Sequence, residues 1–203
     1  MVRACDAGCR ITRWVLPALM ALAVAGCGGG RGWRMTNITG LMPVLKFTLT
    51  DAATGASMDA AHFKGKVVLL YFGYTHCPDV CPMTLADLAA AVRTLGARAD
   101  QVRILFVSVD PARDTIPVLK RYAEAFGPQV VGLRGDQEQL RRLTKRYRVT
   151  YGYEKPDVHG NYVVSHSSAV YVFDRNGHVR LLAQRPNRTA DLAHDLKALL
   201  AEG

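Results

Sequence analysis

Two cysteines, Cys77 and Cys81, lie four residues apart in the segment from Tyr71 to Met83. This segment follows an apolar run over residues 67–72 and precedes a stretch with helical spacing of apolar residues. Two soft sulfur ligands at the junction of a strand and a helix can bind a thiophilic metal or close a disulfide. The function of the chain depends on which of these the pair does.

A purely structural disulfide between Cys77 and Cys81 is the simplest alternative. A four-residue spacing closes a very small loop, and such a loop constrains the unfolded chain little. We therefore favour a chemical role for the sulfur pair over a stabilising one.

The other three of the five cysteines lie near the N-terminus, at Cys5, Cys9 and Cys27. Residues 1–26 begin with basic residues and contain an apolar stretch, Trp14 to Ala25, which is short for a bilayer span and typical of a signal peptide. The stretch ends in Val-Ala-Gly before Cys27 and resembles the lipoprotein box of bacteria, in which cleavage precedes a lipidated cysteine.

This pattern predicts three parts of the chain. Residues 1–26 are expected to form a lipoprotein-type signal peptide. Residues 27–40 are expected to form a flexible, glycine-rich tether that is anchored through a lipid on Cys27. Residues 41–203 are expected to form one folded domain. A plain inner-membrane anchor and a cleaved soluble form remain alternatives.

Lipidation predicts an exported, membrane-anchored protein that faces the periplasm or the cell exterior. That compartment is oxidising, so a thiol pair there becomes a disulfide unless it is reduced or metallated.

The formal net charge of the 203-residue chain is +9. Residues 1–26 hold three of the 26 Lys and Arg residues and one of the 17 Asp and Glu residues, so +7 remains for the rest. The densest basic cluster lies on one predicted helix face: Arg141, Arg142, Lys145, Arg146 and Arg148. Such a face could contact anionic lipid headgroups or an acidic partner, or it could simply be exposed to water. We expect no nucleic-acid partner, because an exported lipoprotein rarely meets one.

Strands and helices are predicted to alternate along the domain. Six strands are expected over residues 44–50, 66–71, 102–109, 130–133, 168–173 and 178–183. A further short strand is expected after the turn at 51–55. Residues 149–153 and 162–164 are expected to form a protruding hairpin. Helices are expected to begin near Cys81, Thr115, Asp136 and Thr189. This order describes an α/β domain with a mixed central sheet and an added N-terminal β-hairpin. A cysteine pair after the first central strand favours the three-layer thioredoxin-like fold.

Three segments in this order resemble the Sco/SenC family of thioredoxin-like copper chaperones. They are Phe72–Pro82 with the cysteines, Ser108–Thr115 with acidic residues, and Val164–Tyr171 with a histidine. The resemblance extends over about residues 41–201. It implies delivery of Cu(I) or Cu(II) to a copper site of cytochrome c oxidase, with a copper donor and a thiol reductant as further partners.

The resemblance implies that Cys77, Cys81 and His166 are the copper ligands. The chemistry of the residues agrees, because thiolates suit Cu(I) and imidazole suits both oxidation states. A helix N-terminus also lowers the pKa of nearby thiols, so we expect both cysteines to be thiolates.

Three polar residues lie close to these candidate ligands in the sequence: Asp110, Asp114 and His76. Asp110 ends a central strand and is expected near the metal site, where its carboxylate would accept a hydrogen bond beside the ligands. Asp114 is expected to cap the following helix. His76 adjoins Cys77, but its backbone direction makes convergence on the same ion awkward.

The principal alternative is a dedicated thiol-disulfide reductase that acts on the copper-ligand cysteines of the oxidase. Thioredoxins separate their cysteines by two residues and place a cis-proline beside them, whereas this chain has three intervening residues and Ser165-His166-Ser167 at that place. The expected function is therefore that of a metallochaperone with coupled thiol chemistry, and a peroxidase is disfavoured.

Overall fold

The structure, a computed structural model, describes residues 32–184 and 188–202. Three parallel strands form the centre of its main sheet: β4 (Val67–Gly73), β5 (Val102–Ser108) and β6 (Val130–Arg134). All seven residues of β4 are buried, which explains why its sequence is a continuous apolar run rather than an alternating one.

Antiparallel strands extend this sheet in both directions. On one side β4 pairs with β9 (Val170–Phe173), then follow β10 (Val179–Ala183) and β1 (Thr36–Asn37). The predicted turn between β9 and β10 is present, and Gly177 has a φ of 77° that favours glycine.

On the other side, β6 pairs with a hairpin of β2 (Thr48–Asp51) and β3 (Ser57–Asp59). The complete order is β1-β10-β9-β4-β5-β6-β2-β3. The predicted mixed sheet with an added N-terminal hairpin is thus confirmed, although the first hairpin strand begins at Thr48 rather than at residue 44.

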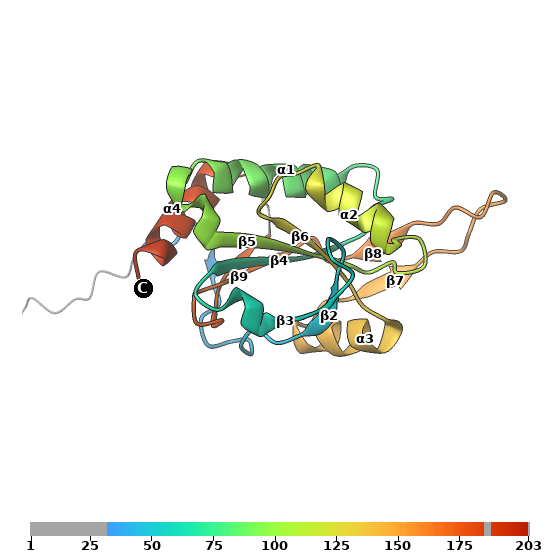
Figure 1. Ribbon diagram of the computed structural model, residues 1–203, viewed down its shortest axis with the longest axis horizontal. Helices are drawn as coiled ribbons and strands as arrows, with labels where there is room; N and C mark the ends of the chain where they lie inside the picture. The colour runs from blue at the N-terminus through green and yellow to red at the C-terminus, as the bar shows by residue number, and fades with distance from the viewer. Residues whose placement is uncertain (1–31, 185–187, 203) are drawn as a thin grey trace, which may run out of the picture. The chain divides into compact units, whose positions relative to one another are not determined.

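Helices cover both faces of the sheet (Figure 1). The helices α1 (Val80–Arg93), α2 (Ile116–Glu124) and α4 (Thr189–Leu200) lie on one face, and α3 (Gln137–Arg146) lies on the other. Two short 3-10 helices, η1 (Ala60–Phe63) and η2 (Gly96–Gln101), lie in connections. The capping box at Asp136 and Gln139 explains where α3 begins. The expected three-layer thioredoxin-like fold is confirmed.

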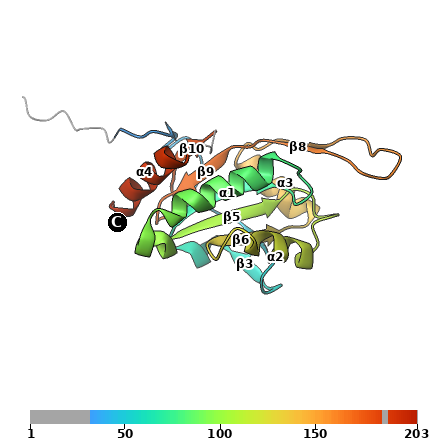
Figure 2. The same ribbon diagram turned by 90° about the horizontal axis from the view of Figure 1, so that it is seen from above.

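A separate two-stranded arm projects from the domain in both views (Figures 1 and 2). Its strands β7 (Tyr151–Tyr153) and β8 (Val164–His166) are antiparallel, and Tyr151 pairs with His166. This is the predicted protruding hairpin. Its last residue is the histidine that the sequence singles out, so the arm places one functional side chain.

The folded domain begins earlier than expected. Met35 and Ile38 are buried, and the buried carboxylate of Asp195 accepts hydrogen bonds from the backbone N–H groups of Arg34 and Met35. The prediction of a flexible tether over residues 27–40 is therefore wrong from residue 33 onward, because these residues bury apolar side chains and form β1.

The predicted signal peptide and the predicted lipid site at Cys27 lie outside the described residues. Within residues 32–184 and 188–202, no helix has the length and apolar character needed to cross a membrane.

Candidate metal and thiol site

The residues expected to do chemistry meet at one edge of the sheet. Gly73 pairs with Ser108 at the carboxyl ends of β4 and β5, so the cysteine segment and the acidic segment leave the sheet side by side. β9 runs antiparallel to β4, and its first residue, Val170, pairs with Tyr71. The segment that carries His166 therefore arrives at this same edge, where functional crevices of α/β sheets lie.

Cys81 and His166 are in contact although 85 residues separate them. The Sγ atom of Cys81, which is fully buried, lies 3.2 Å from Nε2 of His166. The Nδ1 atom of His166 lies 2.9 Å from the carbonyl oxygen of Ser167, which can only accept a hydrogen bond. This contact assigns the ring proton to Nδ1, and the lone pair of Nε2 then faces the sulfur.

Cys77 lies at the N-terminus of α1, where its sulfur performs the capping role. The N-cap residue Asp79 makes no side-chain capping bond, and the Sγ atom of Cys77 instead accepts a hydrogen bond from the backbone N–H of Cys81 at 3.4 Å. This arrangement directs the positive end of the helix at the Cys77 sulfur.

The pKa values of the two thiols diverge. Partial burial raises the pKa of Cys77, but hydrogen bonds from the backbone N–H groups of Cys81, Asp79 and Val80 outweigh it and hold this pKa below its usual value. Burial raises the pKa of Cys81 to about 12. The expectation that the helix N-terminus makes both sulfurs thiolates is therefore wrong for Cys81, because desolvation there exceeds the effect of the helix.

Aromatic rings enclose the buried half of the site. The rings of Tyr71 and Tyr74 lie 6.2 Å and 5.9 Å from the His166 ring, both edge-to-face. Burial lowers the pKa of His166, against a smaller opposing effect of its bond to Ser167, so the imidazole favours the neutral form that binds metals.

Gly73 allows the Cys81 sulfur to lie directly on the sheet. A Cβ atom at this position would come within 2.6 Å of the Phe106 ring and 3.0 Å of the Cys81 sulfur. Any larger residue would displace the sulfur or the ring, so glycine is required here by close approach.

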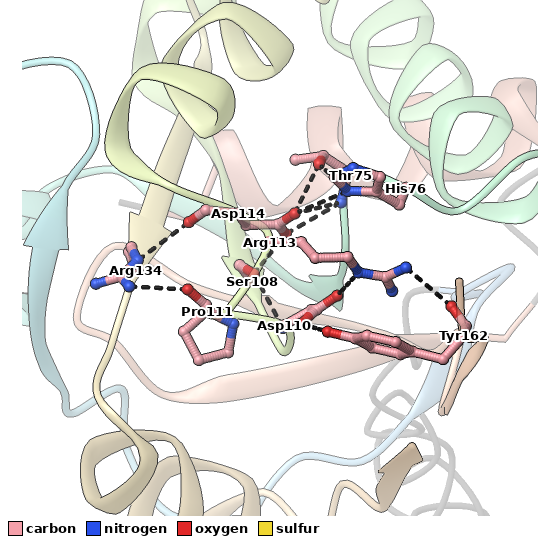
Figure 3. A network of polar contacts seen from close by, with 9 residues as sticks. All are labelled: Thr75, His76, Ser108, Asp110, Pro111, Arg113, Asp114, Arg134 and Tyr162. Carbon is pink, nitrogen blue, oxygen red and sulfur yellow. Dashed lines mark hydrogen bonds and ion pairs between the residues drawn. The ribbon is translucent and has the colours of Figure 1, made fainter. Parts of the chain in front are cut away.

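Figure 3 shows the polar network beneath the cysteine segment. The buried carboxylate of Asp114 accepts hydrogen bonds from the backbone N–H of Thr75 at 3.1 Å, from its hydroxyl at 2.6 Å, and from the hydroxyl of Ser108 at 2.5 Å. The prediction that Asp114 caps α2 is wrong, since Thr115 holds the N-cap position. Asp114 instead ties the cysteine segment to the end of β5.

Asp110 connects the same edge to the arm (Figure 3). Its carboxylate accepts hydrogen bonds from Nε of Arg113 at 2.5 Å and from the hydroxyl of Tyr162 at 2.8 Å, while the Arg113 guanidinium lies 3.6 Å from the centre of the Tyr162 ring. Tyr162 lies in the connection between β7 and β8, so this cluster fixes the arm that ends in His166. A role of Asp110 as an outer neighbour of the site remains a prediction.

His76 is directed at a carboxylate. Its Nδ1 atom lies 3.1 Å from the Thr75 hydroxyl and 3.5 Å from Asp114, and nearly half of its side chain is exposed. That His76 does not join the two sulfurs in binding an ion remains a prediction.

The two cysteines are free thiols. Within the described part of the chain, no group of three or more His, Cys, Asp and Glu side chains is arranged as a formed metal site. Cys81 and His166 thus make a pair of potential donors that are already in contact, and Cys77 lies beside them at the N-terminus of α1.

Several residues of the site were not found by sequence reasoning: Tyr71, Gly73, Tyr74, Arg113 and Tyr162. Strand periodicity already places Tyr71 and Gly73 on one face of β4, which is the signal that could have identified them. Arg113 and Tyr162 are 49 residues apart and carry no local signal of their contact.

The profile of the SCO1/SenC family matches residues 42–201 of this chain. The bovine protein SCO2 homolog, mitochondrial, is 37% identical over 175 residues, which cover 78% of this chain and 66% of the bovine protein. The chain spans about half to two thirds of the length of the mammalian relatives that it matches.

Two solved structures are similar in fold and sequence. ScoI of Bradyrhizobium japonicum with copper bound has a TM-score of 0.70 and 37% identity, covering 77% of this chain and 99% of that one. Apo Sco1 from Thermus thermophilus has a TM-score of 0.73 and 35% identity, covering 84% of this chain and all of that one.

Proposed function

The chain belongs to the SCO1/SenC family, and from this premise we propose that it carries copper on Cys77, Cys81 and His166 and delivers it to a copper centre of cytochrome c oxidase. The copper-bound relative from Bradyrhizobium japonicum and the family resemblance support this proposal. Copper is the cargo of the protein in this function.

The observation that carries the proposal is the 3.2 Å contact between Sγ of Cys81 and Nε2 of His166. A buried sulfur that faces the lone pair of a neutral imidazole is a donor pair suited to a soft or borderline metal. Metal binding releases the Cys81 proton, and the positive ion compensates the cost of a buried thiolate.

Cys77 suits the proposed entry and exit of the ion. It is half-buried, whereas Cys81 is enclosed by Gly73 and the Phe106 ring. A recipient ligand can therefore approach from the Cys77 side and replace one donor at a time. A site with three ligands holds Cu(I) less completely than a closed four-ligand cage, which suits transfer.

Dedicated thiol-disulfide reduction is a second candidate, and the asymmetry of the two thiols favours it. The Cys77 thiolate would attack a partner disulfide, form a mixed disulfide and release one partner thiolate. Cys81 would lose its proton and attack the Cys77 sulfur, so the partner leaves with two thiols and this chain keeps both oxidised sulfurs as a disulfide. The raised pKa of Cys81 would slow this second step. The same chemistry can accompany copper delivery, since a disulfide must be reduced before both sulfurs bind Cu(I).

The proposed location is outside the cytoplasm. A lipid on Cys27 would hold the domain at a membrane, and a copper donor and a thiol reductant in the same compartment would serve the site. These proposals depend on the sequence pattern of residues 1–27.

The test compares copper binding by the reduced domain and its disulfide form. We expect one copper ion per reduced chain, sulfur-to-copper charge-transfer absorption for Cu(II), and no tight Cu(I) binding by the disulfide form. Cys77→Ala and Cys81→Ala should each abolish tight Cu(I) binding, with His178→Ala as a control because that histidine lies in an exposed turn. Equal Cu(I) affinity of either cysteine variant and the unmodified protein would exclude the ligand assignment and leave thiol exchange as the function.

A further inference from the structure

The arm that ends in His166 is not part of the main sheet. Among the strands of the described residues, β7 and β8 pair with each other, whereas the other eight strands form the main sheet. A two-stranded hairpin by itself is marginally stable in water. Other contacts must therefore fix the arm, and with it the distance between His166 and the Cys81 sulfur.

The side chain of Arg113 joins the arm to the end of β5 (Figure 3). Its Nη1 atom donates a hydrogen bond to the backbone carbonyl of Tyr162 at 2.9 Å, and its guanidinium carbon lies 3.6 Å from the centre of the Tyr162 ring. Its Nε atom donates to the buried carboxylate of Asp110, which also accepts the hydrogen bond from the Tyr162 hydroxyl. The backbone, ring and hydroxyl of one arm residue are thus all bound by one pair of charged side chains.

The same guanidinium also lies near the cysteine segment. Its carbon atom is 5.6 Å from the centre of the Tyr74 ring, within the range of a cation–π contact, and Tyr74 precedes Cys77 by three residues. The Tyr74 ring in turn lies edge-to-face against the His166 ring, with 5.9 Å between their centres. Arg113 therefore lies between the two segments that carry the candidate ligands.

The position of this guanidinium has a cost. Its Nη2 atom is buried without a hydrogen-bond partner, which costs about 1–3 kcal/mol. Natural proteins tolerate such local costs mainly at functional sites. The contacts between Arg113 and the arm are thus retained although one polar group stays unpaired.

Two further contacts attach the arm to the domain. Val164 is buried, and the hydroxyl of Tyr153 donates a hydrogen bond to the backbone carbonyl of Val109 at 2.6 Å. Neither contact involves the guanidinium. A change at Arg113 should therefore loosen the arm without unfolding the domain.

We propose that Arg113 is a positioning residue that holds the arm against the cysteine segment and thereby keeps His166 beside the Cys81 sulfur. It acts through Tyr162 and the arm. The inference rests on the proposed function where it connects this geometry with copper binding. The position of the arm itself can be measured in the metal-free protein.

The size of the effect follows from the fraction of molecules that are ready to bind. When only a fraction has the competent conformation, the apparent affinity falls by that fraction. Loss of the guanidinium contacts is expected to lower the fraction with His166 beside Cys81 from nearly all to between about a third and a tenth. The affinity for Cu(II) should then fall about three- to tenfold.

The test uses Arg113→Lys. Lysine keeps the positive charge beside Asp110, but it lacks the planar fork that binds the carbonyl and the carboxylate together and stacks on the ring. The charge of the cluster is therefore unchanged, and only its geometry is altered.

Arg180→Lys is the matched control. The Arg180 guanidinium carbon lies 5.6 Å from the Trp33 ring, and its Nη1 atom forms an ion pair with Glu202. Its neighbour Val179 pairs with Phe173, which pairs with Val68 near the amino end of β4. This second guanidinium with an aromatic and an acidic neighbour thus lies away from the edge that carries the cysteines.

Two measurements on the reduced, metal-free proteins report the position of the arm. Hydrogen exchange followed by mass spectrometry should be about three- to tenfold faster in Arg113→Lys over residues 151–166, because the arm opens more often. The ring-proton signals of His166 in the NMR spectrum should also move, since the Tyr71 and Tyr74 rings no longer have fixed positions beside it. Arg180→Lys should leave both observables unchanged.

Copper binding then shows whether Arg113 acts through His166. Arg113→Lys should lower Cu(II) affinity about three- to tenfold in the otherwise unmodified chain. In the His166→Ala background it should have no further effect, because no imidazole remains to be positioned. A general structural role would lower the affinity equally in both backgrounds.

The outcomes separate this inference from the proposed function. If Arg113→Lys changes neither the arm exchange nor the His166 signals, or if Arg180→Lys changes them equally, the inference is wrong while the copper function is unaffected. Equal losses of Cu(II) affinity with and without His166 would also overturn it. If the unmodified protein binds no copper, the proposed function fails, and the exchange and histidine signals alone decide whether Arg113 positions the arm.

Discussion

The Sγ atom of Cys77 accepts a hydrogen bond from the backbone N–H of Cys81, with 3.4 Å between sulfur and nitrogen. The negative charge of the Cys77 thiolate is thus stabilised by the N-terminus of α1, which begins at Val80 and carries Cys81 in its first turn. Cys81 receives no comparable benefit, because its sulfur is buried against Gly73 and Phe106. The two thiols therefore differ in reactivity although they are four residues apart.

The first prediction concerns alkylation. Iodoacetamide should modify Cys77 first, and its rate should increase with pH through a pKa below that of a free thiol. Cys81 should stay unmodified at neutral pH, because its pKa is about 12 and its sulfur is inaccessible. Mass spectrometry of peptides after timed quenching measures both rates, with Cys77→Ser and Cys81→Ser as single-thiol controls. Equal rates for the two residues would contradict the asymmetry.

The second prediction concerns His166→Ala. Affinity for Cu(II) should fall by more than about tenfold. Loss of a residue that only supports a metal ligand already has an effect of about this size, and His166 is proposed to be a ligand itself. The free energy of unfolding should change less, since the His166 side chain is hydrogen-bonded only to a neighbouring carbonyl and to the Cys81 thiol, and the edge-to-face contacts with the Tyr71 and Tyr74 rings are all that is lost besides these. Titration followed by absorption and urea unfolding measure the two quantities. A variant with unchanged Cu(II) affinity and reduced stability would make His166 a structural residue.

The third prediction concerns stability and pH. Burial lowers the pKa of His166 in the folded apo protein below its value of about 6.5 in the unfolded chain. Between these two values the unfolded chain binds more protons, so the contribution of His166 to stability is complete above pH 6.5 and decreases as the pH falls through the folded pKa. Urea unfolding at pH 7.5 and pH 5 should show a smaller loss of stability for His166→Gln than for the unmodified chain. Parallel pH dependence in both proteins would exclude a shifted pKa at this residue.

The fourth prediction concerns Asp114→Asn. The amide keeps the shape of the carboxylate but loses charged acceptors for the Thr75 and Ser108 donors, so we expect a loss of about 2 kcal/mol in the free energy of unfolding. Copper affinity should also fall, because the cysteine segment is anchored through Thr75. Asp79→Asn is the control, since the Asp79 side chain makes no capping bond. Equal effects of the two substitutions would show that charge near the segment matters and that the Asp114 bonds do not.

The fifth prediction concerns Cys27→Ala. If the sequence before residue 27 is a lipoprotein box, this variant should accumulate as a larger, unprocessed and differently anchored species, because the modified cysteine is required for processing. Membrane fractionation and intact mass measure both properties. Normal processing of the variant would exclude the lipid anchor.

Local pattern was sufficient for most secondary structure. The continuous apolar run of β4, the Asn-Gly turn between β9 and β10, and the capping box of α3 each predict an element that the structure contains. These signals depend on residues close together in the chain, so they can be read in order. The boundary at Trp33 was missed because β1 pairs with a strand more than 140 residues away, where local pattern carries little information.

The amino-acid sequence by itself determined which residues have the chemistry: two thiols at a helix start and one histidine in a motif that resembles a copper-binding family. The tertiary structure alone decided their states, because desolvation and hydrogen bonding depend on neighbours that are distant in sequence. It raises the pKa of Cys81 and lowers that of Cys77, although both lie at the same helix N-terminus. It also assigns Asp114 to the cysteine segment rather than to its adjacent helix, because the parallel register of β4 and β5 brings that segment within hydrogen-bond distance.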